Sequence, residues 1–149
     1  MKTDLSNISS QILGNKETIE TLLNNINKNL DGDTWMLEGP KGIGKATLVK
    51  LITSSLLNLE YNSNSSLFHP DLVLLTKDDK KKNIAVDEIR NLKKLFFKTS
   101  FSGNYRIAII DSINDLNSYG HNAILKIIEE PPKKSFIFII NHQTLSLKR

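Results

Sequence analysis

Apolar residues recur three or four positions apart in several segments of the chain, a spacing that lays them on one face of a helix. The first such segment predicts an N-terminal helix over about residues 11–30, ending at Asp31, Gly32 and Asp33, where the glycine can stop it. A later helix is predicted to follow a short extended piece at 83–86, with Asp87 as its N-cap. Further helical faces are expected from Leu48, Val49, Ile52, Leu56 and Leu57, from Ile89, Leu92, Leu95 and Phe96, and from Ala123, Ile124, Ile127 and Ile128.

Short, largely apolar runs alternate with these helices and have the length of buried strands. Strands rich in Ile, Val and Leu that alternate with helices indicate a parallel sheet covered on both faces. The pattern therefore predicts an α/β fold, a three-layer domain with a central parallel sheet. Pro131 and Pro132 are expected to stop the last helix. The strands are expected over 34–38, 71–76, 106–111 and 135–141, with surface loops over 58–66 and over the charged run 77–82.

A glycine-rich loop joins the first predicted strand to the next helix. Residues 39–45 fit the start of the phosphate-binding loop pattern G-x-x-x-x-G-K-[ST]. In such a loop the glycines let successive backbone N–H groups point at a phosphate, the helix N-terminus adds positive potential, and the lysine reaches the outer phosphates. The candidate cofactor-binding residues are therefore Gly39, Pro40, Lys41, Gly42, Ile43, Gly44, Lys45, Ala46 and Thr47.

Two positions depart from what ATP hydrolysis needs. Where the pattern has a Ser or Thr hydroxyl for Mg²⁺, this chain has Ala46, and Thr47 lies about 100° further round the helix. Asp111 supplies an acid at the end of a strand, the Walker B position, but the next residue is Ser112, which cannot act as a general base at neutral pH without help. We expect an NTPase fold that has lost hydrolysis, with no catalytic residue, and that keeps Lys45 and a weak nucleotide affinity. A loop shifted by one residue, in which Thr47 takes over the metal, stays open as an alternative.

Composition narrows the class of protein. The 149 residues fit one domain, and 39% hydrophobic with 24% charged residues is typical of a globular chain. The absence of cysteine excludes disulfides, thiol catalysis and Cys-based zinc sites, and three scattered histidines form no metal cluster, so we expect no metal site and a reducing, cytoplasmic setting. No apolar run approaches the roughly 20 residues of a membrane span. The net charge of +4 leaves direct DNA contact open, and the lysine-rich run 77–82 is interpreted as a solvated loop.

Several blocks of sequence, in a fixed order and at compatible spacing, carry a specific resemblance. Together they resemble the bacterial clamp-loader AAA+ family, and the last block is similar to that family's N-A-L-L-K-x-L-E-E-P-P. Ala46 and Ser112 make the chain look closer to the delta-prime type of subunit than to the ATP-hydrolysing gamma/tau type. The blocks lie at residues 39–48, 69–72, 84–90 and 122–132.

The resemblance implies a fold, a function and partners together. It implies a P-loop NTPase core of the AAA+, RecA-like kind over residues 1–149, without the family's small lid domain and C-terminal collar. It implies a non-hydrolysing subunit of the DNA polymerase III holoenzyme, without ATPase activity of its own, that helps load the sliding clamp onto primed DNA beside gamma/tau and delta subunits. Gly39 to Lys45 would be the Walker A loop, Asp111 the Walker B acid and Asn141 the sensor-1-like polar residue. No cofactor is then required, ATP with Mg²⁺ would bind weakly, and the family's four-cysteine zinc module is missing.

Two other hypotheses stay open. The chain is an active P-loop ATPase or small kinase if Lys45, Thr47 and Asp111 together hold nucleotide and metal. It is a remnant if it folds but has lost its role in an assembly. Magnesium-dependent ATP turnover that Lys45→Ala abolishes would identify the first, and the sequence beyond Arg149 would bear on the second.

Overall fold

A computed structural model of the chain describes residues 16–28, 31–40, 42, 44–60, 67–76, 86–96, 105–111 and 116–142. Helices and strands alternate along these residues, as the hydrophobic pattern predicts. No helix among them is long and apolar enough to cross a membrane. In chain order the elements are α2 (Lys16–Lys28), β1 (Gly32–Glu38), α3 (Lys45–Leu56), β2 (Leu72–Thr76), α4 (Val86–Phe96), β3 (Arg106–Asp111), α5 (Ser118–Glu129) and β4 (Ser135–Asn141).

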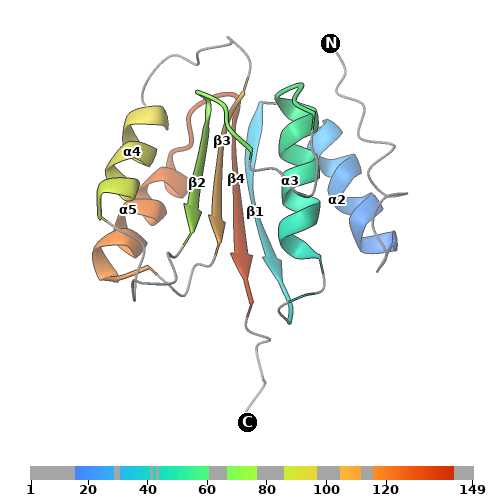
Figure 1. Cartoon of the computed structure of the whole chain (residues 1–149), viewed down its shortest axis with the longest axis horizontal. Helices are drawn as coiled ribbons and strands as arrows, with labels where there is room; N and C mark the ends of the chain where they lie inside the picture. The colour runs from blue at the N-terminus through green and yellow to red at the C-terminus, as the bar shows by residue number, and fades with distance from the viewer. Residues whose placement is uncertain are drawn as a thin grey trace.

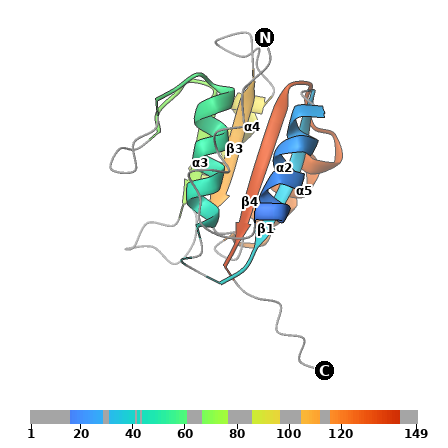
Figure 2. The ribbon, with the colours of Figure 1, turned by 90° about the vertical axis from the view of Figure 1, so that its right-hand side faces the viewer.

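The strands form one sheet of four parallel strands in the order β1-β4-β3-β2. Figure 1 shows α4 and α5 on one side of this sheet and α2 and α3 on the other. Figure 2 is turned so that the side with α2 and α3 faces the viewer. The prediction of an α/β fold, a three-layer domain with a central parallel sheet, is confirmed.

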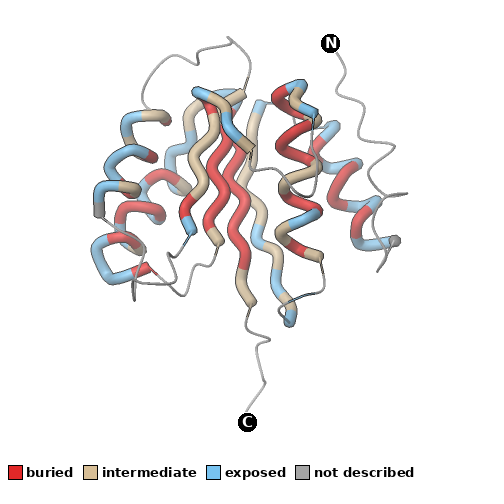
Figure 3. The backbone as a smooth tube through the Cα atoms, in the orientation of Figure 1, coloured by how far each residue is buried: buried red, intermediate tan, exposed pale blue. Residues whose placement is uncertain are grey.

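Side chains along the central strands alternate between the two faces of the sheet and so build two hydrophobic cores. On β4, Phe136, Phe138 and Ile140 are buried with residues of α2 and α3, whereas Ile137 and Ile139 are buried with residues of α4 and α5. Figure 3 shows β3 and β4, in the middle of the sheet, buried along most of their length. Because both faces of these strands are covered, their sequences are almost continuously apolar.

The sequence predicts that Gly32 stops the N-terminal helix, and this prediction is wrong. Helix α2 ends at Lys28, and Gly32 is the first residue of β1, with a φ of +124°. A Cβ atom at this position would overlap the backbone of Ser135, the residue paired with Gly32 in β4. The glycine is therefore required for the close approach of β1 to β4, and for a backbone conformation that other residues rarely adopt.

The bounds of the other predicted strands are close to those observed. The strand expected from residue 34 begins at Gly32, and the one expected from residue 71 begins at Leu72. The strands expected over 106–111 and 135–141 have those bounds. The start of the predicted N-terminal helix at 11–15 and its end at 29–30 lie outside the described residues, as do 61–66 and 77–85 of the predicted loops and extended piece.

The predicted start of α4 is wrong by two residues, because an N-cap at Asp87 would make residue 88 the first helical one, and the extended conformation predicted at residue 86 is not observed. Val86 is already helical, so Asp87 lies in the first turn of the helix and does not cap it. Its charge still favours the helix N-terminus, where the backbone N–H groups carry partial positive charge. Helix α5 ends at Glu129, before Pro131, as predicted.

Candidate phosphate-binding site

The ends of three strands bring the candidate residues to one edge of the sheet. All strands are parallel, so their carboxyl ends lie at the same edge. The register pairs Glu38 at the end of β1 with Asn141 of β4, and Asp111 at the end of β3 with Ile140 of β4. The glycine loop after β1, Asp111 and the end of β4 therefore meet there.

The loop after β1 has the backbone of a phosphate-binding loop at the residues that are described. Gly42 and Gly44 have φ values of +91° and +97°, and Gly44 is the N-cap of α3. A Cβ atom at either glycine would meet nothing within 4 Å, so the glycines are needed for the turn of the backbone and not for space. The backbone N–H of Gly39 donates to the carbonyl of Asn141 over 3.2 Å and fixes the loop to the end of β4. Lys41 and Ile43 lie outside the described residues.

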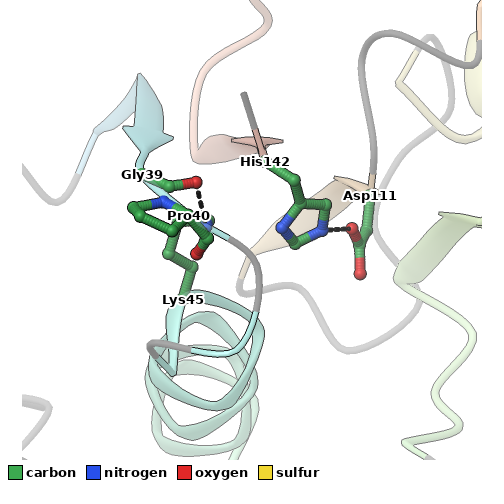
Figure 4. Close-up of polar contacts among 5 residues, drawn as sticks. All are labelled: Gly39, Pro40, Lys45, Asp111 and His142. Carbon is green, nitrogen blue, oxygen red and sulfur yellow. Dashed lines mark hydrogen bonds and ion pairs between the residues drawn. The ribbon is translucent and has the colours of Figure 1, made fainter. Parts of the chain in front are cut away.

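Lys45 is the first residue of α3 and turns back onto its own loop. Its Nζ atom donates to the carbonyl oxygens of Gly39 and Pro40, at 2.5 and 2.6 Å. Figure 4 shows both carbonyls pointing at the ammonium group. Burial lowers the pKa of Lys45 below its ordinary value of 10.5, and the negative charge of Asp111 partly opposes that shift. The ammonium group that a phosphate would need is therefore held by the loop itself.

The two positions that follow Lys45 lack a hydroxyl directed at a metal. Ala46 packs against the core formed with α2 and α3. Thr47 is exposed on α3, one residue further along the helix and about 100° round it. The alternative in which Thr47 takes over the metal gains no support from this position.

A histidine that the sequence did not single out lies against Asp111, the predicted Walker B acid. The Nε2 atom of His142 is 2.6 Å from Oδ1 of Asp111 (Figure 4). The other ring nitrogen, Nδ1, is buried and has no hydrogen-bond partner among the described residues. The sequence alone did not reveal this contact, because it depends on the register that pairs Asp111 with Ile140, two positions before His142.

Asn141 is the last residue of β4, at the sheet edge where the sequence places it. Its backbone carbonyl accepts the hydrogen bond from Gly39. Strand alternation directs its side chain to the face opposite that of Ile140, the face of α4 and α5. Its role as the sensor-1-like residue stays a prediction, and Ser112 lies outside the described residues.

A cavity of about 460 Å³ opens next to the loop, between α2, β1 and α3. Lys45 contributes to its wall, and the indole Nε1 of Trp35, which also lines it, is buried without a hydrogen-bond partner among the described residues. The remaining wall is largely apolar and includes Ile19, Leu22, Leu37 and Leu48.

These residues do not fit a magnesium ion. Magnesium takes oxygen ligands, usually one or two side chains together with the phosphates of a nucleotide. Ala46 has no ligand oxygen, and the Asp111 carboxylate is engaged by His142. In the described part of the chain, no group of three or more His, Cys, Asp or Glu side chains could hold a metal ion.

The parallel sheet, the glycine loop after β1 and the acid at the end of β3 define a domain of the P-loop NTPase class. The family model described as "DNA polymerase III, delta subunit" matches residues 14–148, and the chain belongs to this family. A DNA polymerase III subunit delta' of Buchnera aphidicola subsp. Baizongia pistaciae is 32% identical over 126 residues, which cover 72% of this chain and 37% of the relative.

Other relatives extend the comparison. The subunit delta' of Bacillus subtilis is 28% identical over 136 residues, covering 84% of this chain and 41% of the relative. A subunit gamma of Buchnera aphidicola subsp. Schizaphis graminum is 26% identical over 133 residues, covering 83% and 36%. The chain thus spans between 36% and 41% of the length of these relatives.

One solved structure shares the fold. The DNA polymerase III gamma subunit-related protein of Thermotoga maritima superposes with a TM-score of 0.64 at 20% sequence identity. The superposition covers 83% of this chain and 38% of that protein. At this identity the likeness shows the fold alone.

Proposed function

We propose that the chain is the P-loop domain of a clamp-loader subunit of the delta' type, which acts in DNA replication by helping to load the sliding clamp onto primed DNA. In this role it lies beside gamma/tau and delta subunits in the cytoplasm and reaches the clamp and the DNA through them. The observation that carries the proposal is membership of the DNA polymerase III delta family over residues 14–148, combined with a P-loop that has alanine at the metal position.

The delta' assignment rests on the site and not on sequence identity. Relatives of the delta' and gamma types match this chain at 32%, 28% and 26% identity, values too close to separate them. A subunit that hydrolyses ATP needs a hydroxyl at position 46, an open acid at position 111 and a general base nearby. Here the three positions offer Ala46, an Asp111 bonded to His142, and Ser112.

The proposed domain does not hydrolyse ATP. Loss of a general base alone lowers turnover by roughly a hundredfold or more, and the missing metal ligand acts in addition. An active ATPase or kinase would have to hold its metal through Thr47, which is exposed in the first turn of α3, about 100° round the helix from Ala46. The site supports a domain that keeps the shape of a P-loop without its chemistry.

The proposal is tested by assembly. Purified chain is mixed with gamma/tau and delta subunits of its own organism and with the sliding clamp, and complexes are identified by native mass spectrometry. We expect a complex that contains this chain once, either alone or after the lid and collar domains of a relative are fused to it. The absence of any complex in both forms would refute the proposed role.

ATP turnover tests the non-hydrolysing part separately. We expect the chain with Mg²⁺ and ATP to give background turnover, and Lys45→Ala to give the same background. Turnover that Lys45→Ala abolishes would instead identify an active P-loop enzyme.

A further inference from the structure

The Asp111 carboxylate already has a hydrogen-bonding side chain beside it. His142 Nε2 lies 2.6 Å from Asp111 Oδ1, within the range of a strong hydrogen bond to a carboxylate. The side chains of His142 and Asp111 are 24% and 25% exposed, so the pair is largely shielded from water. A hydrogen bond to a charged group is stronger in such surroundings than on an open surface.

The fold explains how His142 reaches this position. Asp111 is paired with Ile140 across β3 and β4, and Ile140 belongs to the core that includes α3. His142 lies two residues beyond Ile140 and therefore follows it to the same face of the sheet. This is the face where α3 begins at the glycine loop. In the view of Figure 4 the imidazole ring lies between the loop and the Asp111 carboxylate.

A magnesium ion in a P-loop site bridges the nucleotide phosphates to the Walker B acid. His142 already takes up Oδ1 of Asp111, one of the two oxygens through which this acid would hold a metal. We propose that His142 is an internal ligand of Asp111 that occupies the place of magnesium, so that the domain cannot use Mg²⁺ to bind nucleotide. The inference rests on the proposed function, in which a clamp-loader subunit has lost ATP hydrolysis, and it names the residue that keeps the acid from a metal.

His142 and Ala46 are then two independent obstacles. Ala46 removes one metal ligand, whereas His142 blocks the other. Restoring the hydroxyl with Ala46→Ser should therefore be insufficient by itself. Only the combination of Ala46→Ser with a residue too short to reach Asp111 at position 142 should restore a site in which magnesium strengthens nucleotide binding.

The experiment measures ATP affinity by calorimetry, with Mg²⁺ and with EDTA, and compares the ratio of the two dissociation constants. We expect a ratio near one for the natural chain and for Ala46→Ser. We expect Ala46→Ser with His142→Ala to bind ATP about tenfold more tightly, or better, when Mg²⁺ is present than with EDTA. In this variant magnesium no longer has to displace a hydrogen bond to the charged Asp111 carboxylate, and such a bond corresponds to about a factor of ten in affinity. Adding Asp111→Ala should abolish that gain.

Further variants separate this role from a structural one. His142→Thr, which suits the end of a strand and cannot reach Asp111, should behave as His142→Ala does and serves if the alanine variant does not fold. The matched control is His69→Ala, because His69 precedes β2 at the opposite edge of the sheet and contacts Asp71. Combined with Ala46→Ser, it should leave the ratio near one.

Two outcomes would overturn the inference. The first is a full magnesium effect in Ala46→Ser alone, since His142 would then be no obstacle. The second is a folded Ala46→Ser, His142→Thr variant whose ATP affinity is the same with and without Mg²⁺, including no binding in either condition. Neither bears on assembly with gamma/tau and delta subunits, so failure of the inference is distinguishable from failure of the proposed function.

Discussion

Replacing Gly32 with alanine should strongly lower the free energy of unfolding, because the new side chain would introduce both backbone strain and a steric overlap at this residue. Its φ of +124° lies in a region that residues with a Cβ rarely adopt, which costs about 1–3 kcal/mol. The new Cβ would also overlap backbone atoms of Ser135, which cannot rotate away as a side chain would. Strands β1 and β4 must then separate at their first pair and lose about 1 kcal/mol of hydrogen bonding. The sum is about 3 kcal/mol.

Urea unfolding followed by circular dichroism measures this loss. With an m-value of about 1–3 kcal/mol/M, a loss of about 3 kcal/mol lowers the midpoint by at least about 1 M. The matched control is Gly42→Ala, because Gly42 has a positive φ of +91° but nothing within 4 Å of an added Cβ. It should cost about 1–2 kcal/mol, from backbone strain alone. The reasoning is refuted if Gly32→Ala destabilises the chain no more than Gly42→Ala does.

Further predictions concern a helix cap, the core and a buried amine. Asn117 caps α5 by accepting from the N–H of Gly120 over 2.8 Å, so Asn117→Ala should cost about 0.5–2 kcal/mol in urea unfolding, whereas exposed Asn122→Ala should cost less. Phe138→Ala removes a fully buried ring from the centre of the sheet and should cost about 3–5 kcal/mol; a loss below 1 kcal/mol would contradict the described core. Burial lowers the pKa of Lys45 in the folded chain, so the unfolded chain binds this proton more tightly and stability should rise as pH increases toward 10.5. Lys45→Met should remove that part of the rise, which is measured as the difference between the two unfolding curves at each pH.

The fold could be predicted where a local pattern settles the structure. The runs at 106–111 and 135–141 are apolar at nearly every position and are bounded by polar residues, and their bounds were correct. Pro131 stops α5 through its own backbone chemistry, whatever surrounds it. The glycine loop between a strand and a helix was recognisable for the same reason, because its conformational requirement belongs to the glycines themselves.

The rest depended on neighbours that are distant in sequence. Gly32 precedes Asp33 and resembles a helix stop, and its actual requirement comes from Ser135, at the start of the last strand. His142 follows a strand as one more polar residue, and only the register of β3 against β4 gives it a partner in Asp111. Likewise, the pattern around Lys45 predicts a lysine that reaches for a phosphate, whereas the structure shows it bonded to its own loop.

These internal contacts explain why a degenerate P-loop can keep its shape. To bind ATP, Lys45 has to release two carbonyl oxygens, and Asp111 has to release His142 before a metal can enter. Each hydrogen bond to a charged group contributes about 1.5–3 kcal/mol, or roughly a factor of ten or more in affinity. An active P-loop recovers such costs from magnesium and phosphate contacts, and here Ala46 removes part of that recovery. A domain whose lysine and acid are satisfied internally holds one loop conformation whether or not nucleotide is present, because a ligand shifts an equilibrium only by its differential affinity for the two states. Internally satisfied contacts of this kind are consistent with the non-hydrolysing role proposed above.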